Sequence, residues 1–207
     1  MFQRSAVIAI LTLVSMQAAY AAQKHECGSL ENGFGPFDYR TATEKQRNTV
    51  EHYHFTENVE TLRKGQSTTR IGGDISYTLQ AFPNHPRALA AMAELARREK
   101  ASQPKGSKYT ISCWFERAMR FRPDDGMVRV VYGITLLKAG QRDQAIQELH
   151  KADAMLPDNA NVNYNLGLAY LDAKDYDKAL VHAKRAYELG FPLPGLRDRL
   201  QKAGKWQ

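Results

Sequence analysis

Apolar and polar residues follow a helical period through nearly all of the chain after residue 74. Within residues 86–100, for example, alanines and leucines share one face. Short turns such as 138–142 and 172–176 separate successive segments, as expected of helices stacked in pairs. The pattern therefore predicts an all-α fold, with helices at about residues 74–82, 86–100, 109–121, 126–138, 142–155, 160–172, 176–189 and 193–203.

The segment before these helices has a different composition. Residues 22–40 are rich in glycine and show little periodicity. This predicts an extended segment that anchors the aromatic rings of Phe34, Phe37 and Tyr39 on the helical body. Residues 43–54 are compatible with one short helix.

A second short helix is expected to follow. Thr56 is placed to cap it, and Gly65 to end it. Residues 66–73 then form a polar loop, and Asp74 is expected to cap the next helix.

Two stretches of the helical region superimpose at a period of 34 residues. Small residues recur where paired helices must touch, and proline recurs near the end of the unit because it cannot continue a helix. The recurring residues are Gly133, Ala145, Leu149, Ala152 and Pro157, matched by Gly167, Ala179, Ala183, Ala186 and Phe191 with Pro192. The same period run backwards aligns Ile111, Phe115, Ala118 and Pro123 with the second helix of this unit.

This pattern resembles the tetratricopeptide repeat (TPR). The resemblance implies a TPR-type α-solenoid of about three helix pairs, with a degenerate first repeat, a C-terminal capping helix and an irregular N-terminal segment. The corresponding division is a signal peptide at 1–21, an N-terminal extension at 22–73 and a TPR domain at 74–207. Asn163 and Ala183 depart from the large aromatic residues that the family often has at these positions.

One repeat is longer than the others. Ala93 and Gly133 are 40 residues apart instead of 34, so an insertion is expected around Ser102–Ser107. An inserted loop is either part of a recognition surface or a neutral variation in length.

TPR arrays hold other molecules, and the first helices of successive repeats line their concave groove. The resemblance implies these groove positions: Arg87, Ala90, Glu94, Arg97, Met127, Val130, Ile134, Leu137, Asn161, Tyr164, Leu168 and Leu171. An apolar strip with Tyr164 as an anchor suits an amphipathic helix or an extended peptide. Two alternatives concern the same groove. Phe34, Phe37 and Tyr39 could fill it, and a clamp for a C-terminal carboxylate is disfavoured because Ile134 stands where such clamps use asparagine.

The beginning of the chain has the composition of a secretory signal. Arg4 precedes an apolar run at residues 6–16, and Ala19-Tyr20-Ala21 supplies a small-x-small cleavage site. The run is shorter than the roughly 20 residues that a membrane anchor needs. We therefore expect a periplasmic or secreted protein with no integral membrane segment after cleavage.

The net charge of +7 indicates which kinds of partner the protein can attract. In an exported protein, excess positive charge suits an acidic protein partner or an anionic surface better than nucleic acid. The basic residues of the first full repeat are Arg87, Arg97, Arg98, Arg117, Arg120, Arg122 and Arg129. Ion pairing with nearby acidic residues is the alternative explanation for this cluster.

Cys27 and Cys113 are the only cysteines, and an oxidising compartment favours a structural disulfide between them. Two free thiols are the alternative. His52 and His54 form the only grouping suggestive of metal chemistry, and no zinc-protease, nucleophile-elbow or phosphate-loop motif is present.

Three functional hypotheses remain. The first is a non-enzymatic adaptor without a cofactor, which holds a protein or peptide partner in the bacterial envelope. The second is a structural subunit that self-associates through its repeat ends. The third is a metal-dependent enzyme that uses His52 and His54.

Overall fold

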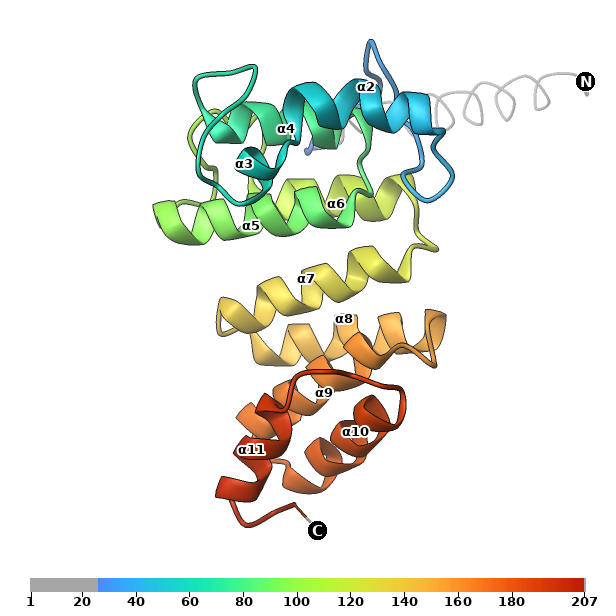
Figure 1. The fold of residues 1–207 in the computed structure, drawn as a ribbon, viewed down its shortest axis with the longest axis vertical. Helices are drawn as coiled ribbons and strands as arrows, with labels where there is room; N and C mark the ends of the chain where they lie inside the picture. The colour runs from blue at the N-terminus through green and yellow to red at the C-terminus, as the bar shows by residue number, and fades with distance from the viewer. Residues whose placement is uncertain (1–25, 207) are drawn as a thin grey trace, which may run out of the picture.

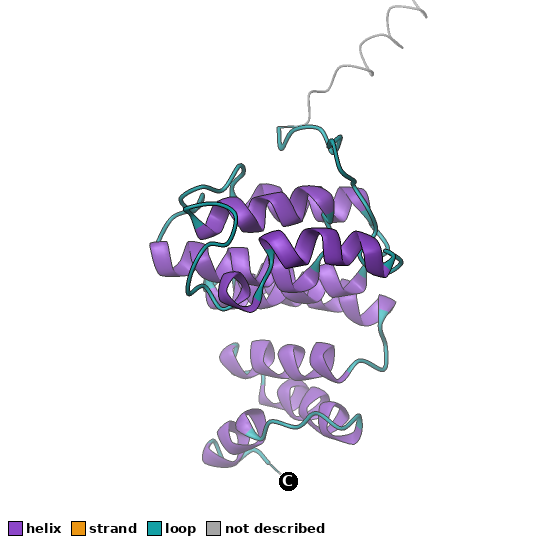
Figure 2. Ribbon diagram, turned by 45° about the horizontal axis from the view of Figure 1, so that its top comes forward, coloured by secondary structure: helices purple, strands orange, loops and turns teal. Residues whose placement is uncertain are grey.

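The computed structural model describes residues 26–206, and the predicted signal peptide lies outside these residues. The described part of the chain is all-α, with loops between the helices and no strand (Figure 2). Its helices are α2 (Glu44–His54), α3 (Glu57–Glu60), α4 (Ile71–Ala81), α5 (Pro86–Glu99), α6 (Ile111–Phe121), α7 (Gly126–Lys138), α8 (Arg142–Met155), α9 (Ala160–Asp172), α10 (Tyr176–Glu188) and α11 (Gly195–Lys202). They stack along one axis from α2 to α11, as an α-solenoid does (Figure 1).

The helix pairs α5–α6, α7–α8 and α9–α10 correspond to the three predicted repeats, and α11 packs on the last pair. Glycine allows the helices to approach closely at the two repeat-equivalent positions. A Cβ atom added at Gly133 of α7 would lie 2.6 Å from Leu149 Cγ of α8, and one added at Gly167 of α9 would lie 2.5 Å from Leu196 Cδ2 of α11. Glycine thus admits the paired helix at the first position and the C-terminal helix at the second.

The first helices of the three pairs are all capped at their N-termini by a side chain. The side chains of His85, Asp125 and Asn159 each accept hydrogen bonds from backbone N–H groups in the first turn of α5, α7 and α9. Such caps satisfy donors that have no partner within the helix. His85 can accept through Nδ1 only in its neutral form, and burial lowers the pKa of this imidazole.

The N-terminal segment is fixed to the second helix of the first pair. Cys27 forms a disulfide with Cys113 of α6. Arg117, four residues further along the same helix, is buried. Arg117 Nη1 donates to the carbonyl oxygens of Cys27 and Ser29, at 2.9 and 2.6 Å. The disulfide predicted from the cysteine count is thus present in the structure, and it ties the irregular segment to the helical body.

The aromatic residues of this segment do not fill the groove, so that alternative was wrong. Phe37 and Tyr39 pack against Phe82, with ring centroids 6.0 and 5.7 Å apart, and Tyr39 also stacks on His85 at 3.9 Å. Phe34 joins the same small core through Phe37. These residues therefore cover the end of α4 and the residue that caps α5.

The start of α4 differs from the expectation. The helix begins at Ile71, so the domain boundary predicted just before Asp74 falls within it. Asp74 is fully buried in the first turn, where its carboxylate accepts hydrogen bonds from the backbone N–H groups of Gln66, Ser67 and Thr68. It closes the preceding loop instead of capping the helix.

Two other predicted helices are shorter than expected. α3 has a single turn and ends before Leu62, whose φ of 59° is left-handed, so Gly65 does not end it. The expected cap is also absent, since the Thr56 side chain makes no hydrogen bond to the first turn. α11 begins at Gly195 instead of Leu193.

The inserted loop of the longest repeat is mostly exposed, but its end at Ser107 is buried. Lys108 N–H donates to Ser76 Oγ of α4 at 3.0 Å, and Trp114 Nε1–H donates to Ser107 Oγ at 2.9 Å. The insertion at Ser102–Ser107 therefore joins α4 to the first full repeat.

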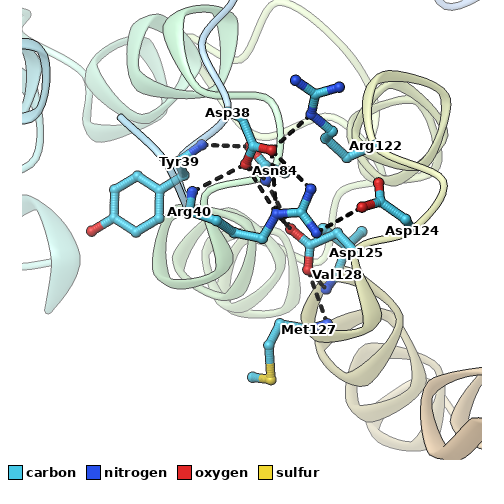
Figure 3. Close-up of polar contacts among 9 residues, drawn as sticks. All are labelled: Asp38, Tyr39, Arg40, Asn84, Arg122, Asp124, Asp125, Met127 and Val128. Atoms are coloured by element: carbon cyan, nitrogen blue, oxygen red, sulfur yellow. Dashed lines mark hydrogen bonds and ion pairs between the residues drawn. The ribbon is translucent and has the colours of Figure 1, made fainter. Parts of the chain in front are cut away.

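A polar network connects the N-terminal segment with two loops between repeats (Figure 3). The Asp38 carboxylate accepts from Arg40 Nη2, Arg122 Nε and Asn84 Nδ2, each at 2.8 Å. Asn84 Nδ2 also donates to Asp125, the residue that caps α7, at 2.8 Å. The hydrogen bonds from Arg40, together with the bond from Asn84, hold the pKa of Asp38 well below its usual range.

Among residues 26–206, no helix is both long enough and apolar enough to cross a bilayer.

Candidate functional site

A hollow of about 260 Å³ lies between α5 and α7, the first helices of two successive pairs. Three alanines of α5 border it, each with only a methyl group, so space remains that longer side chains would fill. The apolar lining consists of Ala90, Ala93, Ala96, Ile111, Val131, Ile134 and Ala139. The hollow is therefore an apolar site on the face that carries the first helices of the repeats.

Charged residues surround the hollow. Glu94, Arg97 and Lys138 contribute to its lining. Arg97 donates two hydrogen bonds to the Glu94 carboxylate, at 2.8 and 2.7 Å, and Arg98 Nε donates a third at 3.2 Å. The hydrogen bond from Arg97 is the main cause that lowers the pKa of Glu94 to about 2, and the charge of Lys138 contributes. Glu94 is therefore ionised at neutral pH.

The charges around the hollow are unbalanced. Three cations, Arg97, Arg98 and Lys138, lie around the single carboxylate of Glu94. Within the described part of the chain, Lys138 forms no ion pair. The opening is therefore positively charged while the wall is apolar.

The structure brings four of the predicted groove residues to this hollow, namely Ala90, Glu94, Arg97 and Ile134. Arg87 lies elsewhere, at 3.4 Å from Glu60 and 3.8 Å from Glu51, so it connects α5 to α2 and α3.

Other predicted groove positions belong to the hydrophobic core. Val130 is 2% exposed and Leu171 is 8% exposed, so neither offers a surface to a partner. Met127, Leu137 and Leu168 are partly buried against the same core.

Tyr164, the expected anchor, is partly covered by the chain's own C-terminal region. Its ring stacks on Phe191 with centroids 3.8 Å apart. A Cβ atom at Gly195 would lie 3.2 Å from its hydroxyl. Figure 1 shows the loop between α10 and α11 passing over α9, whereas Asn161 remains exposed at the start of α9. The open site is thus displaced from Tyr164 toward α5.

Sequence reasoning missed several members of the hollow, including Val131, Thr135 and Lys138. The groove positions implied by the repeat alignment are other residues of α7. A signal was available in the spacing of Ala90, Ala93 and Ala96, which are three residues apart and line the hollow together.

The basic cluster of the first full repeat is mostly neutralised by ion pairs within the protein. Arg120 pairs with Glu116 at 2.8 Å, and Arg129 pairs with Glu148 at 2.8 Å. Arg122 pairs with Asp38, as described above. Internal pairing, the alternative explanation for the cluster, therefore holds for most of these residues.

The two histidines singled out for metal chemistry have separate environments. His54 Nδ1 lies 3.0 Å from Asp74 Oδ1, and the His54 ring stacks on Tyr77 at 3.9 Å. His52 is exposed and contacts Tyr53. Within the described residues, no group of three or more His, Cys, Asp or Glu side chains is placed to hold a metal ion.

Comparison with known proteins agrees with the geometry. Residues 115–186 match the model of the tetratricopeptide repeat family. The fold resembles that of PilF of Pseudomonas aeruginosa, with a TM-score of 0.54 and 21% identity over 78% of this chain and 68% of that chain. A thermophilic TPR protein of Thermus thermophilus gives a TM-score of 0.49 and 22% identity over 63% and 69% of the two chains.

No curated protein matches the sequence significantly. The match over residues 115–186 and the α-solenoid fold together show that this chain contains tetratricopeptide repeats.

Proposed function

We propose that this protein is a non-enzymatic adaptor that holds a protein or peptide partner at the hollow between α5 and α7. The observation that carries the proposal is an apolar hollow, open on the face of the first helices, with charged residues at its opening. TPR arrays present extended concave surfaces to their partners. Interfaces of this kind concentrate their affinity in a few side chains that fill pockets.

The size of the hollow favours a side chain over a larger ligand. Its volume of about 260 Å³ is below the range of roughly 300–1,000 Å³ that is typical of sites for drug-sized molecules. One large side chain, or two neighbouring ones, would occupy it.

We also propose that the partner is met outside the cytoplasm, in the bacterial envelope. The signal-like composition of residues 1–21 and the disulfide between Cys27 and Cys113 support this proposal. Disulfides persist in oxidising compartments and are rare in the cytosol.

Site-specific photo-crosslinking in the source cells tests the adaptor function. A photoreactive residue in place of Ala139, which is exposed beside the hollow, is expected to form an adduct with a protein identifiable by mass spectrometry. The control places the same residue at Lys184, which is exposed on α10. Equal adducts from both positions, or none from Ala139, would contradict the proposal.

A further inference from the structure

We infer that the hollow between α5 and α7 recognises a segment of a partner protein in which a large apolar side chain stands beside a carboxylate. This inference rests on the proposed function and specifies the chemistry of the partner. Two independent features of the hollow carry it, namely the apolar wall and the excess of positive charge at the opening.

The wall determines the apolar part of the ligand. Ile111, Val131 and Ile134 offer branched aliphatic surface, while the methyl groups of Ala90 and Ala93 leave room opposite them. A leucine, methionine or phenylalanine side chain placed there exchanges water contact for contact with these residues. Burying one such side chain changes an affinity by about tenfold or more.

The opening determines the charged part. Both oxygens of Glu94 already accept hydrogen bonds from Arg97, and one also accepts from Arg98. The Lys138 ammonium, in contrast, pairs with none of the carboxylates of residues 26–206. It can therefore donate to a carboxylate supplied from outside, and Arg97 and Arg98 add to the positive potential there.

The same charges disfavour other partners. A basic segment would bring a further cation close to Arg97, Arg98 and Lys138 with only Glu94 to offset them. Complementary charge at the edge of an interface mainly selects the partner and speeds its association. An uncharged apolar segment would gain nothing from Lys138. An acidic residue next to the apolar anchor uses both features at once.

Selection from a random peptide library displayed on phage tests the inference with the oxidised full chain. The sequences enriched on the wild-type protein are then made as fluorescein-labelled peptides, and their affinities are measured by fluorescence anisotropy. Two variants alter the hollow. Ala90→Phe fills it from an exposed position, and Lys138→Glu reverses the unpaired charge. The matched controls are Ala154→Phe and Lys184→Glu, at exposed positions of α8 and α10.

The inference predicts enriched peptides with a large apolar residue and an Asp or Glu within a few positions. Ala90→Phe is expected to weaken their binding about tenfold or more. Lys138→Glu is expected to weaken it about threefold or more, with a smaller effect at high salt. A peptide with lysine in place of its acidic residue should bind Lys138→Glu better than wild type. Neither control should change the affinity.

Several results would overturn the inference, and they separate it from the proposed function. Peptides that need the hollow but show no preference for acidic residues would remove the charge element and leave the adaptor function intact. The inference would also be overturned if acidic peptides bound Ala90→Phe as tightly as wild type, or if the library yielded no peptide whose binding this variant abolishes. Crosslinking at Ala139 tests the adaptor function separately. A concentration-dependent increase in mass that Ala90→Phe abolishes would show that a second copy of this chain occupies the hollow.

Discussion

The two halves of the molecule are stabilised in different ways. From α2 to α6, buried polar side chains hydrogen-bond to loops, to helix starts and to residues far away in the sequence, and the disulfide closes a segment of 86 residues. Asp74, Asn84, His85 and Arg117 are each at most 1% exposed in this half. From α7 to α11, the fully buried positions are mainly small or aliphatic, as at Ala145 and its repeat equivalent Ala179.

This difference follows from periodicity. The C-terminal half repeats a unit whose small residues let paired helices pack, and each unit supports its neighbour. The N-terminal half contains a longer repeat and an irregular segment, so its helices do not pack through a periodic set of small residues. Specific hydrogen bonds and a disulfide stabilise this half instead. The hollow lies where α5 of one half meets α7 of the other.

Removing the disulfide is expected to give the largest difference in stability between the two halves. In the chain-entropy model, a bridge across 86 residues stabilises the folded chain by about 4 to 5 kcal/mol. The double variant Cys27→Ser with Cys113→Ser should lose about this much free energy of unfolding. Hydrogen exchange should increase in α4 to α6 and change little in α9 and α10.

Reduced wild-type protein serves as the control, since it should show the same exchange pattern as the double variant. An equal loss of protection in α9 and α10 would mean that the two halves unfold as one unit.

The reverse experiment perturbs the C-terminal half. Gly133→Val places side-chain atoms where a Cβ alone would approach Leu149 Cγ to 2.6 Å. Overpacking of this kind costs about 3 kcal/mol. Thermal unfolding should shift accordingly, with faster exchange in α7 and α8 and unchanged protection in α4.

Gly33→Val is the matched control, because an added Cβ at Gly33 meets nothing within 4 Å. If Gly133→Val were as mild as Gly33→Val, the close approach of α7 and α8 would not be what requires glycine.

The regular half shows how far sequence reasoning extends. The bounds predicted for α7, α8 and α9 agree with the structure, since short turns separate these helices and one 34-residue unit repeats. The starts of α4 and α11 were misplaced. At α4, Asp74 is of a residue type that often caps helices, but its carboxylate accepts hydrogen bonds from the loop that precedes the helix.

The polar contacts of the irregular half could not be predicted in the same way. Asn84 and Asp38 are 46 residues apart, and Arg117 reaches carbonyl groups about 90 positions away. No local pattern encodes such pairs. The capping role of His85 was an exception, because His85 stands where the later pairs have Asp125 and Asn159. Aligning the starts of the pairs would have revealed it.

The candidate site was only partly predicted for a related reason. The family register placed Ala90, Glu94, Arg97 and Ile134 in one groove, and these four residues line the hollow. It could not tell that Phe191 covers Tyr164, because the repeat match shows which positions correspond and does not show where the side chain after α10 packs.

The Asp38 network offers a pH test of the N-terminal half. The pKa of Asp38 is held below its unfolded value near 3.8, mainly by hydrogen bonds from Arg40. Its contribution is therefore fully present above about pH 4 and is lost as the pH falls through the lower, folded value. Asp38→Asn should cost about 2 kcal/mol at pH 7. The difference from wild type should shrink below pH 4.

Urea unfolding at a series of pH values measures this difference. A constant gap between Asp38→Asn and wild type down to pH 2 would show that the ionised carboxylate is not the stabilising group. Asp177→Asn, at an exposed position of α10, controls for the loss of a surface charge.

The smallest expected effect concerns the hollow itself. The Arg97 side chain is 58% exposed, so its pairing with Glu94 is open to solvent and adds little to stability. Arg97→Gln should leave the urea midpoint unchanged within error. Arg129→Gln, in contrast, removes a pair whose side chains are 17% and 13% exposed and which joins α7 to α8, and it should cost about 1.5 kcal/mol. If Arg97→Gln proved equally destabilising, the charged edge of the hollow would be part of the scaffold joining the two halves, and it would not be a surface free to bind a partner.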